Sequence, residues 1–500
     1  MKKTLRGLFF QTDSRAEYYY DDYSGMVFPC PDGLKKTLQG LESESSGQIG
    51  IIPDDRSDGW RTFISERRHK YGAFWGIDRP PENPAEQDAE KIAATVKQNG
   101  FRQIILTVTG NCNMKCRYCI NSDIYPYSDK MTFDSMPFSI ARAALNYYLD
   151  NLERIRKTDP GRTAVITFYG GEPLLEFSLI KEIVQYVRSK KVKNLLFTLT
   201  TNGLLLNEEI SDFLVANKFA VWVSIDGPEN QHDRNRIMAG EKGTFQRVFS
   251  NIRNFRKRYP DYYLLGFLVT YDWKTDIREL RNFFYNNIEF KNSLFMFNPV
   301  GSYFTKYYSR FSDEERSHFA EQINEIKKEL RASPLNFNDP VINFFITTPY
   351  RLQLMRKILG SPGRPEIPAT GTCIPGEKIC VLPDGRFQPC ERVPGLANIG
   401  DVTEGLDFDK IARLISLYNK NIANNCRGCP VMQLCKTCFS HFWSGKEFKK
   451  PLPSFCKDQI LWIRTILEET YSLIEARPEY YEEIIKLYQK RYSRLLSLNY

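Results

Sequence analysis

The sequence predicts an α/β protein built around a parallel sheet, either open or closed into a barrel. Six apolar, β-branched runs alternate with helical patterns between residues 103 and 332. Most of these runs lack an alternation of polar and apolar residues, which is typical of parallel strands buried on both faces. In such sheets the chemistry gathers beyond the carboxyl ends of the strands.

The expected strands begin at Gln103, Ala164, Asn194, Ala220, Tyr263 and Ser293, and the expected helices cover 137–157, 179–190, 242–258, 276–288 and 312–332. The last helix has Ser312 as an N-cap candidate with Glu315 three residues later, which is the pattern of a capping box. Four residues lie at or just past strand ends: Cys112, Gly170, Asn202 and Asp226. We therefore expect these four residues to share one site.

Other segments flank this sheet. Residues 1–95 contain strand-like stretches at 7–13 and 16–30 and helical patterns at 33–41 and 58–72, and they predict a β-hairpin with helices that suits a binding module. The acidic, Pro-rich stretch 78–90 predicts a linker, and the Pro- and Gly-rich stretch 359–373 predicts a second boundary. The chain from about Gln459 is expected to be helical. The expected domains are 1–95, 96–360, 361–460 and 461–500.

Composition narrows the class of protein. The chain has 500 residues, of which 42% are hydrophobic and 26% charged, as in ordinary globular proteins. It contains no apolar run of the ~18 residues that a membrane span needs, and its start is too polar for a signal peptide, so we expect a cytoplasmic protein without a membrane partner. The net charge of +9 suits an acidic partner. Because the basic residues are spread along the chain, no nucleic acid is expected.

The 12 cysteines are expected to be reduced, and they fall into three groups. Cys30 stands alone and is expected to be a small buried hydrophobe. Three lie within eight residues, spaced C-x3-C-x2-C, namely Cys112, Cys116 and Cys119; eight come late, namely Cys373, Cys380, Cys390, Cys426, Cys429, Cys435, Cys438 and Cys456. All-thiolate sites suit soft metals and iron–sulfur clusters. Three thiolates on a [4Fe–4S] cluster leave one iron open, whereas a zinc knuckle would lack its fourth ligand.

The first group, with the aromatic Tyr118 before its last cysteine, resembles the radical S-adenosylmethionine (SAM) enzymes. Three later segments resemble motifs of that family in the same order: 170–173 (GGEP), 201–203 and 224–228. The resemblance implies that the open iron chelates SAM, whose reductive cleavage gives a 5′-deoxyadenosyl radical. It implies SAM contacts at Tyr118, Gly170, Gly171, Glu172, Pro173, Asn202, Ser224, Asp226 and Arg236, with Arg234 as the alternative to Arg236. The glycines would let the main chain approach SAM; taken alone, GGEP could be a simple turn.

The eight late cysteines resemble the SPASM domain, which carries two auxiliary [4Fe–4S] clusters. The family order implies one cluster on Cys373, Cys380, Cys390 and Cys438 and another on Cys426, Cys429, Cys435 and Cys456. The last pair is C-x2-C where the family usually has C-x3-C. The alternative is structural zinc at 426–438, but the five-residue middle gap is short for a zinc ribbon. In sulfatase-maturing relatives a carboxylate near Glu391 acts as a base, so Glu391 is the candidate catalytic base; a solvated Glu is the alternative.

The resemblance covers roughly residues 103–456 and implies a radical SAM partial (β/α)6 barrel with three [4Fe–4S] clusters and an external electron donor of flavodoxin or ferredoxin type. Residues 1–95 resemble the winged-helix-like recognition element of ribosomal-peptide maturases, to which the leader of a precursor peptide adds as a strand. The expected function is to install a side-chain crosslink in such a peptide, most simply a thioether between a Cys sulfur and a carbon. The alternatives are formylglycine formation in a sulfatase, carbon–carbon crosslinking or epimerisation and, outside enzymes, an iron–sulfur redox sensor.

Overall fold

The structure is a computed structural model. It describes residues 6–43, 59–74, 88–125, 134–301, 305–332, 339–354, 356, 373–393, 395, 397–426, 428–435, 437–444 and 446–486. The expected linker at 78–90 and the expected boundary at 359–373 lie mostly outside the described residues, as do residues 487–500 of the last expected segment. In the described part of the chain, no helix is long and apolar enough to cross a membrane.

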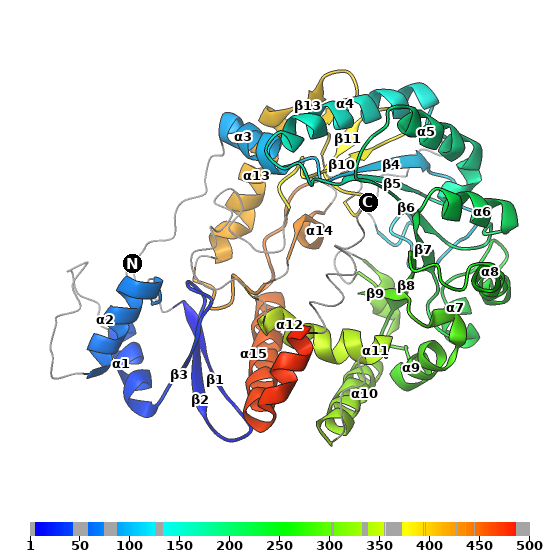
Figure 1. Ribbon diagram of the computed structural model, residues 1–500. Helices are drawn as coiled ribbons and strands as arrows, with labels where there is room; N and C mark the ends of the chain where they lie inside the picture. The colour runs from blue at the N-terminus through cyan, green and yellow to red at the C-terminus, as the bar shows by residue number, and fades with distance from the viewer. Residues whose placement is uncertain are drawn as a thin grey trace.

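The centre of the molecule is an eight-stranded sheet with the order β11-β10-β4-β5-β6-β7-β8-β9. Six consecutive parallel strands of this sheet are the ones expected from the sequence: β4 (Gln103–Thr109), β5 (Ala164–Gly170), β6 (Leu195–Thr201), β7 (Ala220–Ser224), β8 (Leu265–Tyr271) and β9 (Leu294–Pro299). The sheet curves, and its helices cover the outer side, so the expected partial barrel is confirmed (Figure 1).

The helices of the barrel follow the expected positions, with two short additions. They are α4 (Phe138–Arg156), α5 (Phe177–Ser189), α6 (Glu208–Ala216), α7 (Glu229–Asp233), α8 (Phe245–Arg258), α9 (Ile277–Asn286) and α10 (Asp313–Ala332), and α11 (Pro340–Ile342) and α12 (Thr348–Leu354) come after them. The sequence did not predict α6, which has only nine residues, or α7, which has five. The N-cap of α6 is Asn207, whose side chain accepts a hydrogen bond from the Ile210 backbone N–H.

Alternate residues of each strand face opposite sides of the sheet. Along β4, Ile104, Leu106 and Val108 belong to the large core that the sheet shares with its helices. The residues between them include Thr107 and Thr109, which therefore face the inside of the barrel. Hydroxyl groups continue on this inner face, since Thr167 and Thr198 on the next two strands lie 2.7 Å apart, Oγ1 to Oγ1. Hydroxyl groups therefore line part of the inner face of the barrel.

The cysteine-rich region adds two strands to this sheet, which the sequence reasoning did not anticipate. Strand β10 (Lys378–Val381) pairs in parallel with β4, and β11 (Phe387–Gln388) pairs antiparallel with β10. Cys380 lies beside Ile105 in this register, and its Sγ is 3.6 Å from Thr107 Oγ1. The sheet thus continues across the expected division at residue 360. A four-residue strand between cysteines is too short to show a period in the sequence.

The N-terminal segment forms a three-stranded antiparallel sheet of β1 (Gly7–Gln11), β2 (Glu17–Asp21) and β3 (Val27–Pro29). Helices α1 (Asp32–Ser43) and α2 (Gly59–Tyr71) contribute Leu34, Leu38 and Ile64 to its own small core. Cys30 is 1% exposed within that core, which agrees with its expected role as a buried hydrophobe. Helix α3 (Ala89–Asn99) follows and packs on α4 and on α13 (Phe408–Asn421) of the main body.

The remaining elements lie in the cysteine-rich region: β12 (Gly400–Asp401), β13 (Gly405–Leu406), α13 (Phe408–Asn421), α14 (Phe439–Phe442) and α15 (Pro453–Ala476). Helix α15 begins before the expected start at Gln459, with Pro453 in its first turn. It lies between the N-terminal sheet and the barrel (Figure 1). A second core joins Leu8, Phe10 and Tyr20 of the N-terminal sheet to Ile463 and Leu467 of α15. The N-terminal sheet is therefore packed against the rest of the protein.

Candidate active site

The first cysteine group lies on the loop that follows β4. Two backbone hydrogen bonds clamp this loop to the segment after β7, from Lys115 N–H to the Ile237 carbonyl (2.6 Å) and from Arg117 N–H to the Asn235 carbonyl (2.9 Å). Cys112 is exposed, and Cys116 and Cys119 are half-buried. The clamp places Arg236, which lies between the two acceptor residues, against the cysteine loop.

The three thiols are electrostatic neighbours of one another and of Arg236. Burial raises the pKa of each thiol, and neighbouring thiols add to the increase: Cys119 acts on Cys112, Cys112 on Cys116, and Cys116 on Cys119. The positive charge of Arg236 lowers the pKa of all three. Such a cation favours the thiolate form, which is the form that ligates metals.

The guanidinium of Arg236 also carries an unpartnered donor. The side chain is 6% exposed, and its Nε has no hydrogen-bond partner among the described residues. A buried donor without a partner is unfavourable. An anionic group bound by three adjacent thiolates would give this N–H an acceptor, so the residues present fit an iron–sulfur cluster at this place.

Tyr118 connects Arg236 to the end of β7. Arg236 Nη1 donates to the Tyr118 hydroxyl (2.8 Å), which donates to Asp226 Oδ2 (2.5 Å). Asp226 Oδ1 accepts the backbone N–H of Thr270 on the next strand (3.0 Å). Arg234, the alternative to Arg236, instead forms an ion pair with Asp272 at 2.6 Å. Of the two arginines, Arg236 is the one joined to the cysteine loop.

Glu172 ties the end of β5 to the end of β6. Its buried carboxylate accepts from Thr201 Oγ1 (2.8 Å), Asn202 N–H (2.7 Å) and Leu174 N–H (3.1 Å). Burial raises the pKa of Glu172 to about 7, although these donors act in the opposite direction. Asn202 in turn donates from Nδ2 to Asn113 Oδ1 (2.7 Å) and lies 3.8 Å from Cys112 Sγ. The GGEP and TNG segments therefore support the cysteine loop directly.

The two glycines of GGEP are needed for packing against that loop. A Cβ on Gly170 would lie 2.2 Å from the Thr109 carbonyl oxygen, and one on Gly171 would lie 2.2 Å from the Asn111 carbonyl oxygen. Gly170 also has a φ of 148°, which disfavours any other residue. The role of these glycines in SAM binding stays a prediction; their close contacts in this structure are with the main chain before Cys112. Pro173 starts a short 3-10 helix, η2 (Pro173–Glu176), and Ser224 is half-buried at the end of β7.

A second group of cysteines lies on or next to the added strands, with Cys380 in β10 and Cys390 two residues after the end of β11. Cys390 Sγ donates to Glu391 Oε2 at 3.1 Å. Burial raises the pKa of Cys380 to about 12, and the charge of Glu391 contributes. Tyr169, which the sequence reasoning missed, is held neutral by burial and by the charges of Glu391, Cys119 and Cys380, all of which raise its pKa. Tyr169 thus lies within electrostatic reach of both cysteine groups; its position directly before Gly170 was the available signal.

The structure also gathers Cys426, Cys429, Cys435 and Cys456, here named the second auxiliary set. Burial raises the pKa of Cys426 to about 12, and the other three thiols each add to this increase. In the described part of the chain, no group of three or more His, Cys, Asp or Glu side chains has the arrangement to hold a metal ion. An iron–sulfur cluster instead takes its thiolates on separate irons, and a set of four thiols has the right chemistry for it.

Cys438 has different surroundings. Its backbone N–H donates to His441 Nδ1 (3.1 Å), and its Sγ is 2.9 Å from Ser440 Oγ. Burial raises its pKa, but the hydrogen bond and charge of His441 outweigh burial and lower the pKa to about 7. This thiol is therefore prepared to ionise. Among the described residues, no hydrogen bond joins Cys438 to Cys380 or Cys390, so one cluster on all three stays a prediction.

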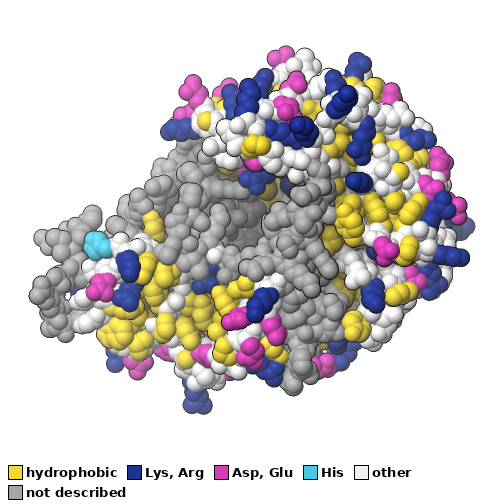
Figure 2. Space-filling model, viewed as in Figure 1, with side chains coloured by type: hydrophobic (Ala, Val, Ile, Leu, Met, Phe, Trp, Pro, Cys, Tyr) yellow, Lys and Arg dark blue, Asp and Glu magenta, His cyan; other side chains and the backbone are white. Residues whose placement is uncertain are grey.

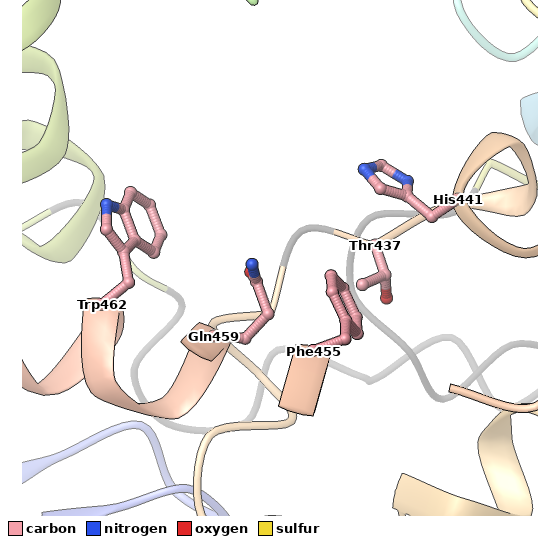
Figure 3. A pocket seen from close by; sticks show the side chains of 5 residues that line it. All are labelled: Thr437, His441, Phe455, Gln459 and Trp462. Carbon is pink, nitrogen blue, oxygen red and sulfur yellow. The ribbon is translucent and has the colours of Figure 1, made fainter. Parts of the chain in front are cut away.

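A cavity of about 520 Å³, which includes space open to solvent, lies beside Cys438 and Cys456. It is lined by Thr437, His441, Phe455, Gln459 and Trp462, whose side chains come from α14, α15 and the segment before α14 (Figure 3). Trp462 is 44% exposed. The lining joins aromatic surface to an imidazole, an amide and a hydroxyl, which suits a peptide segment better than a simple apolar ligand.

Comparisons with known proteins bear on the barrel and on most of the chain. Residues 106–283 match the family model described as the Radical SAM superfamily. The cysteine-type anaerobic sulfatase-maturating enzyme of Clostridium novyi (strain NT) is 22% identical over 353 residues, 67% of this chain and 86% of that protein. The corresponding enzyme of Clostridium perfringens (strain ATCC 13124) is 26% identical over 346 residues, 67% of this chain and 87% of that protein.

Solved structures agree with this match at the level of the fold. "Native anSMEcpe with bound AdoMet" superposes with a TM-score of 0.55 at 21% identity and covers 77% of this chain and 98% of that chain. The match includes nearly all of the solved protein, so part of the present chain has no counterpart in it. The family match over the barrel, together with the cysteine loop and its supports, identifies residues 106–283 as a radical SAM domain.

Proposed function

We propose that the protein is a radical SAM maturase that installs a thioether, from a Cys sulfur to a carbon, in a ribosomally made precursor peptide. The observation that carries this choice is the N-terminal sheet packed on α15. The superposition with the structure named "Native anSMEcpe with bound AdoMet" includes 98% of that chain but only 77% of this chain. The remaining 23% of this chain is long enough to include an additional peptide-binding element.

The proposal assigns a SAM-binding [4Fe–4S] cluster to Cys112, Cys116 and Cys119. It assigns auxiliary clusters to two sets, Cys373, Cys380, Cys390 and Cys438, and Cys426, Cys429, Cys435 and Cys456. With SAM, the first cluster supplies the one-electron chemistry that removes a hydrogen atom from a substrate carbon. The chain's own contribution is position and charge: Arg236 offers its buried Nε–H to the anion, and Glu172 and Asn202 hold the loop.

Thioether formation also requires an acceptor for the proton of the substrate thiol. The carbon loses a hydrogen atom, the thiol loses a proton, and one electron leaves as the C–S bond forms; the auxiliary clusters would take that electron. Glu391 is the proposed base. It accepts its present hydrogen bond from Cys390, and a Cys390 thiolate that ligates iron can no longer donate it. Cluster assembly would thus free Glu391 Oε2 for a substrate proton.

The proposed peptide partner would add as a strand at β3, because β1 on the opposite edge packs on α15. An acidic leader would suit the net charge of +9. On the face shown in Figure 2, Lys and Arg side chains are interspersed with Asp and Glu, which does not resemble the broad basic surface of a nucleic-acid-binding protein. A flavodoxin- or ferredoxin-type donor would supply electrons.

Formylglycine formation in a sulfatase is the second candidate. The relatives that share 67% of this chain are cysteine-type sulfatase-maturating enzymes. A solved structure named "Native anSMEcpe with bound AdoMet and Cp18Cys peptide" has a TM-score of 0.53 and 19% identity. A carbon–carbon crosslink has weaker support, from the radical SAM cyclopropyl synthase TigE of Paramaledivibacter caminithermalis, 26% identical over 30% of this chain.

The deciding experiment is anaerobic incubation of the reconstituted protein with SAM, dithionite and one of two peptides. One is a Cys-rich peptide with an acidic leader; the other is a peptide with a cysteine-type sulfatase sequence. A thioether keeps the sulfur, loses two hydrogens and no longer reacts with thiol reagents, whereas formylglycine loses the sulfur and reacts with hydrazides. Absence of 5′-deoxyadenosine would overturn both candidates, and formylglycine in the second peptide alone would overturn the thioether proposal.

A further inference from the structure

A carboxylate of the N-terminal sheet is buried against the second auxiliary set. Asp22 follows β2, and its side chain has 0% exposure. Its Oδ1 accepts the backbone N–H of Gln433 (2.8 Å) and the Tyr20 hydroxyl (3.0 Å), and its Oδ2 accepts Arg6 Nε (2.8 Å). Gln433 lies between Cys429 and Cys435, so one hydrogen bond joins the N-terminal sheet to a loop bounded by two proposed cluster ligands.

Apolar packing follows the same path. Val431 and Leu434, from the loop between Cys429 and Cys435, share a core with Leu8, Phe10 and Tyr20 of the N-terminal sheet. Cys429 itself packs against that core. The contact is close enough for the charge of Asp22 to raise the pKa of Cys429 and Cys435. Both the polar and the apolar contacts of the sheet therefore depend on the conformation of one short cysteine loop.

A loop held at both ends by ligands has fewer conformations than a free one, and its contacts cost less entropy to form. We propose that the second auxiliary set anchors the N-terminal sheet, with Asp22 as the positioning residue between them. Assembly of a cluster on this set fixes the 429–435 loop and so orders β2 and β3. The importance of that order for peptide binding rests on the proposed function; the anchoring itself does not.

The chain offers a matched control in the neighbouring residue. Asp21 is 1% exposed, and its carboxylate accepts from Ser24 N–H (2.8 Å), Ser24 Oγ (2.5 Å) and Phe74 N–H (3.2 Å). All of these partners belong to the N-terminal segment. Asp21→Ala therefore weakens the sheet internally, whereas Asp22→Ala also removes its bond to the cysteine loop. Asp22→Asn is expected to have an intermediate effect. Its amide oxygen can still accept the hydrogen bonds from Gln433 and Tyr20, but its amide NH2 cannot accept the one from Arg6 Nε.

The first measurement is hydrogen–deuterium exchange of the full-length reconstituted protein. We expect Cys429→Ala to speed exchange several-fold in residues 17–29, and Cys112→Ala to leave these residues unchanged because it alters a different loop. Equal exchange of residues 17–29 in Cys429→Ala and the wild-type protein would overturn the proposal. If Cys429→Ala speeds exchange throughout β4–β9 as well, it has unfolded, and the Asp22 series below then decides.

The second measurement is the rate at which a ferrous chelator removes iron, on a background in which Cys112, Cys116 and Cys119 are Ala. We expect loss several-fold faster in Asp22→Ala, an intermediate rate in Asp22→Asn and no change in Asp21→Ala. If Asp21→Ala loses iron as fast as Asp22→Ala, Asp22 only stabilises the N-terminal sheet in general, and its positioning role is overturned. Neither readout needs SAM cleavage or a peptide, so failure here leaves the proposed maturase function untouched.

Discussion

Tyr118 and Arg236 are joined by a hydrogen bond of 2.8 Å between the cysteine loop and the segment after β7. Two backbone hydrogen bonds flank this contact and hold the loop against the segment that carries Arg236. The same hydroxyl donates to Asp226, and Asp226 accepts from β8. The cysteine loop is thus connected through one phenol to the ends of two barrel strands.

Tyr118→Phe tests this connection. Removal of the hydroxyl leaves Arg236 Nη1 and Asp226 Oδ2 without their shared partner in a buried site, and this costs about 1–3 kcal/mol of unfolding free energy. We expect a lower denaturation midpoint and slower formation of 5′-deoxyadenosine. Tyr263→Phe is the control, because Tyr263 is 59% exposed. Equal behaviour of the two variants in both assays would contradict the network described for Tyr118.

Gly171→Ala tests whether GGEP supports the cysteine loop by close packing. The added Cβ would lie 2.2 Å from the Asn111 carbonyl oxygen, so the backbone before Cys112 must move. We expect loss of SAM cleavage and of iron from the first cysteine group, measured by 5′-deoxyadenosine formation and iron analysis. Gly161→Ala is the matched control, since its added Cβ would lie 3.9 Å from Asp159 Oδ1, which is an ordinary contact. Normal iron content in Gly171→Ala would show that the loop tolerates this contact.

Glu172 predicts a pH dependence of stability. Burial raises its pKa from 4.5 to about 7. Between pH 4.5 and about 7, Glu172 is therefore protonated in the folded protein but ionised in the unfolded chain. The stability from this group is complete below about pH 4 and is lost as the pH rises through about 7. Glu172→Gln cannot titrate, and its unfolding free energy should lack this component.

The measurement is denaturant unfolding of the wild-type protein and Glu172→Gln from about pH 5 to about pH 8. We expect the advantage of the wild-type protein to shrink by on the order of 3 kcal/mol over this range. The amide of Glu172→Gln can also destabilise the protein where it faces the Asn202 N–H. That destabilisation is the same at every pH, so it does not alter the change with pH in the wild-type advantage. A wild-type advantage that grows as the pH rises would mean that Glu172 is ionised in the folded protein at low pH.

The sequence was sufficient for the barrel because its strands carry a strong local signal. Runs such as that from Gln103 are apolar, β-branched and bounded by glycine, and each became a parallel strand. The positions of Cys112, Gly170, Asn202 and Asp226 at strand ends followed from the same reasoning. Contacts among them, such as Glu172 with Asn202, could not be predicted, because they depend on side-chain directions after the sheet has closed.

The parts that the sequence did not predict depend on pairing between distant segments. Nothing local in Lys378–Val381 indicates that it pairs with β4, about 270 residues earlier, since edge pairing depends on register and burial in three dimensions. Asp22 reads as an exposed acidic residue in a turn, yet it is buried against Gln433. The Pro-rich stretch 78–90 predicts a linker after residues 1–95, but nothing local in the sequence indicates that the N-terminal sheet shares a core with α15.

The triple variant of Cys112, Cys116 and Cys119 to Ala tests the assignment of the three clusters. Eleven thiolates and one open iron predict roughly 12 irons per chain after anaerobic reconstitution, and the variant should lose about a third of them. It should form no 5′-deoxyadenosine, because the remaining clusters would have four protein ligands each and no place for SAM. Cys30→Ala is the control, since Cys30 is buried in the N-terminal core and belongs to none of the sets. Continued SAM cleavage by the triple variant would place the SAM site elsewhere. Stoichiometric zinc in place of the remaining iron would contradict both auxiliary clusters. Zn²⁺ has no redox chemistry and cannot accept the electron released when the C–S bond forms.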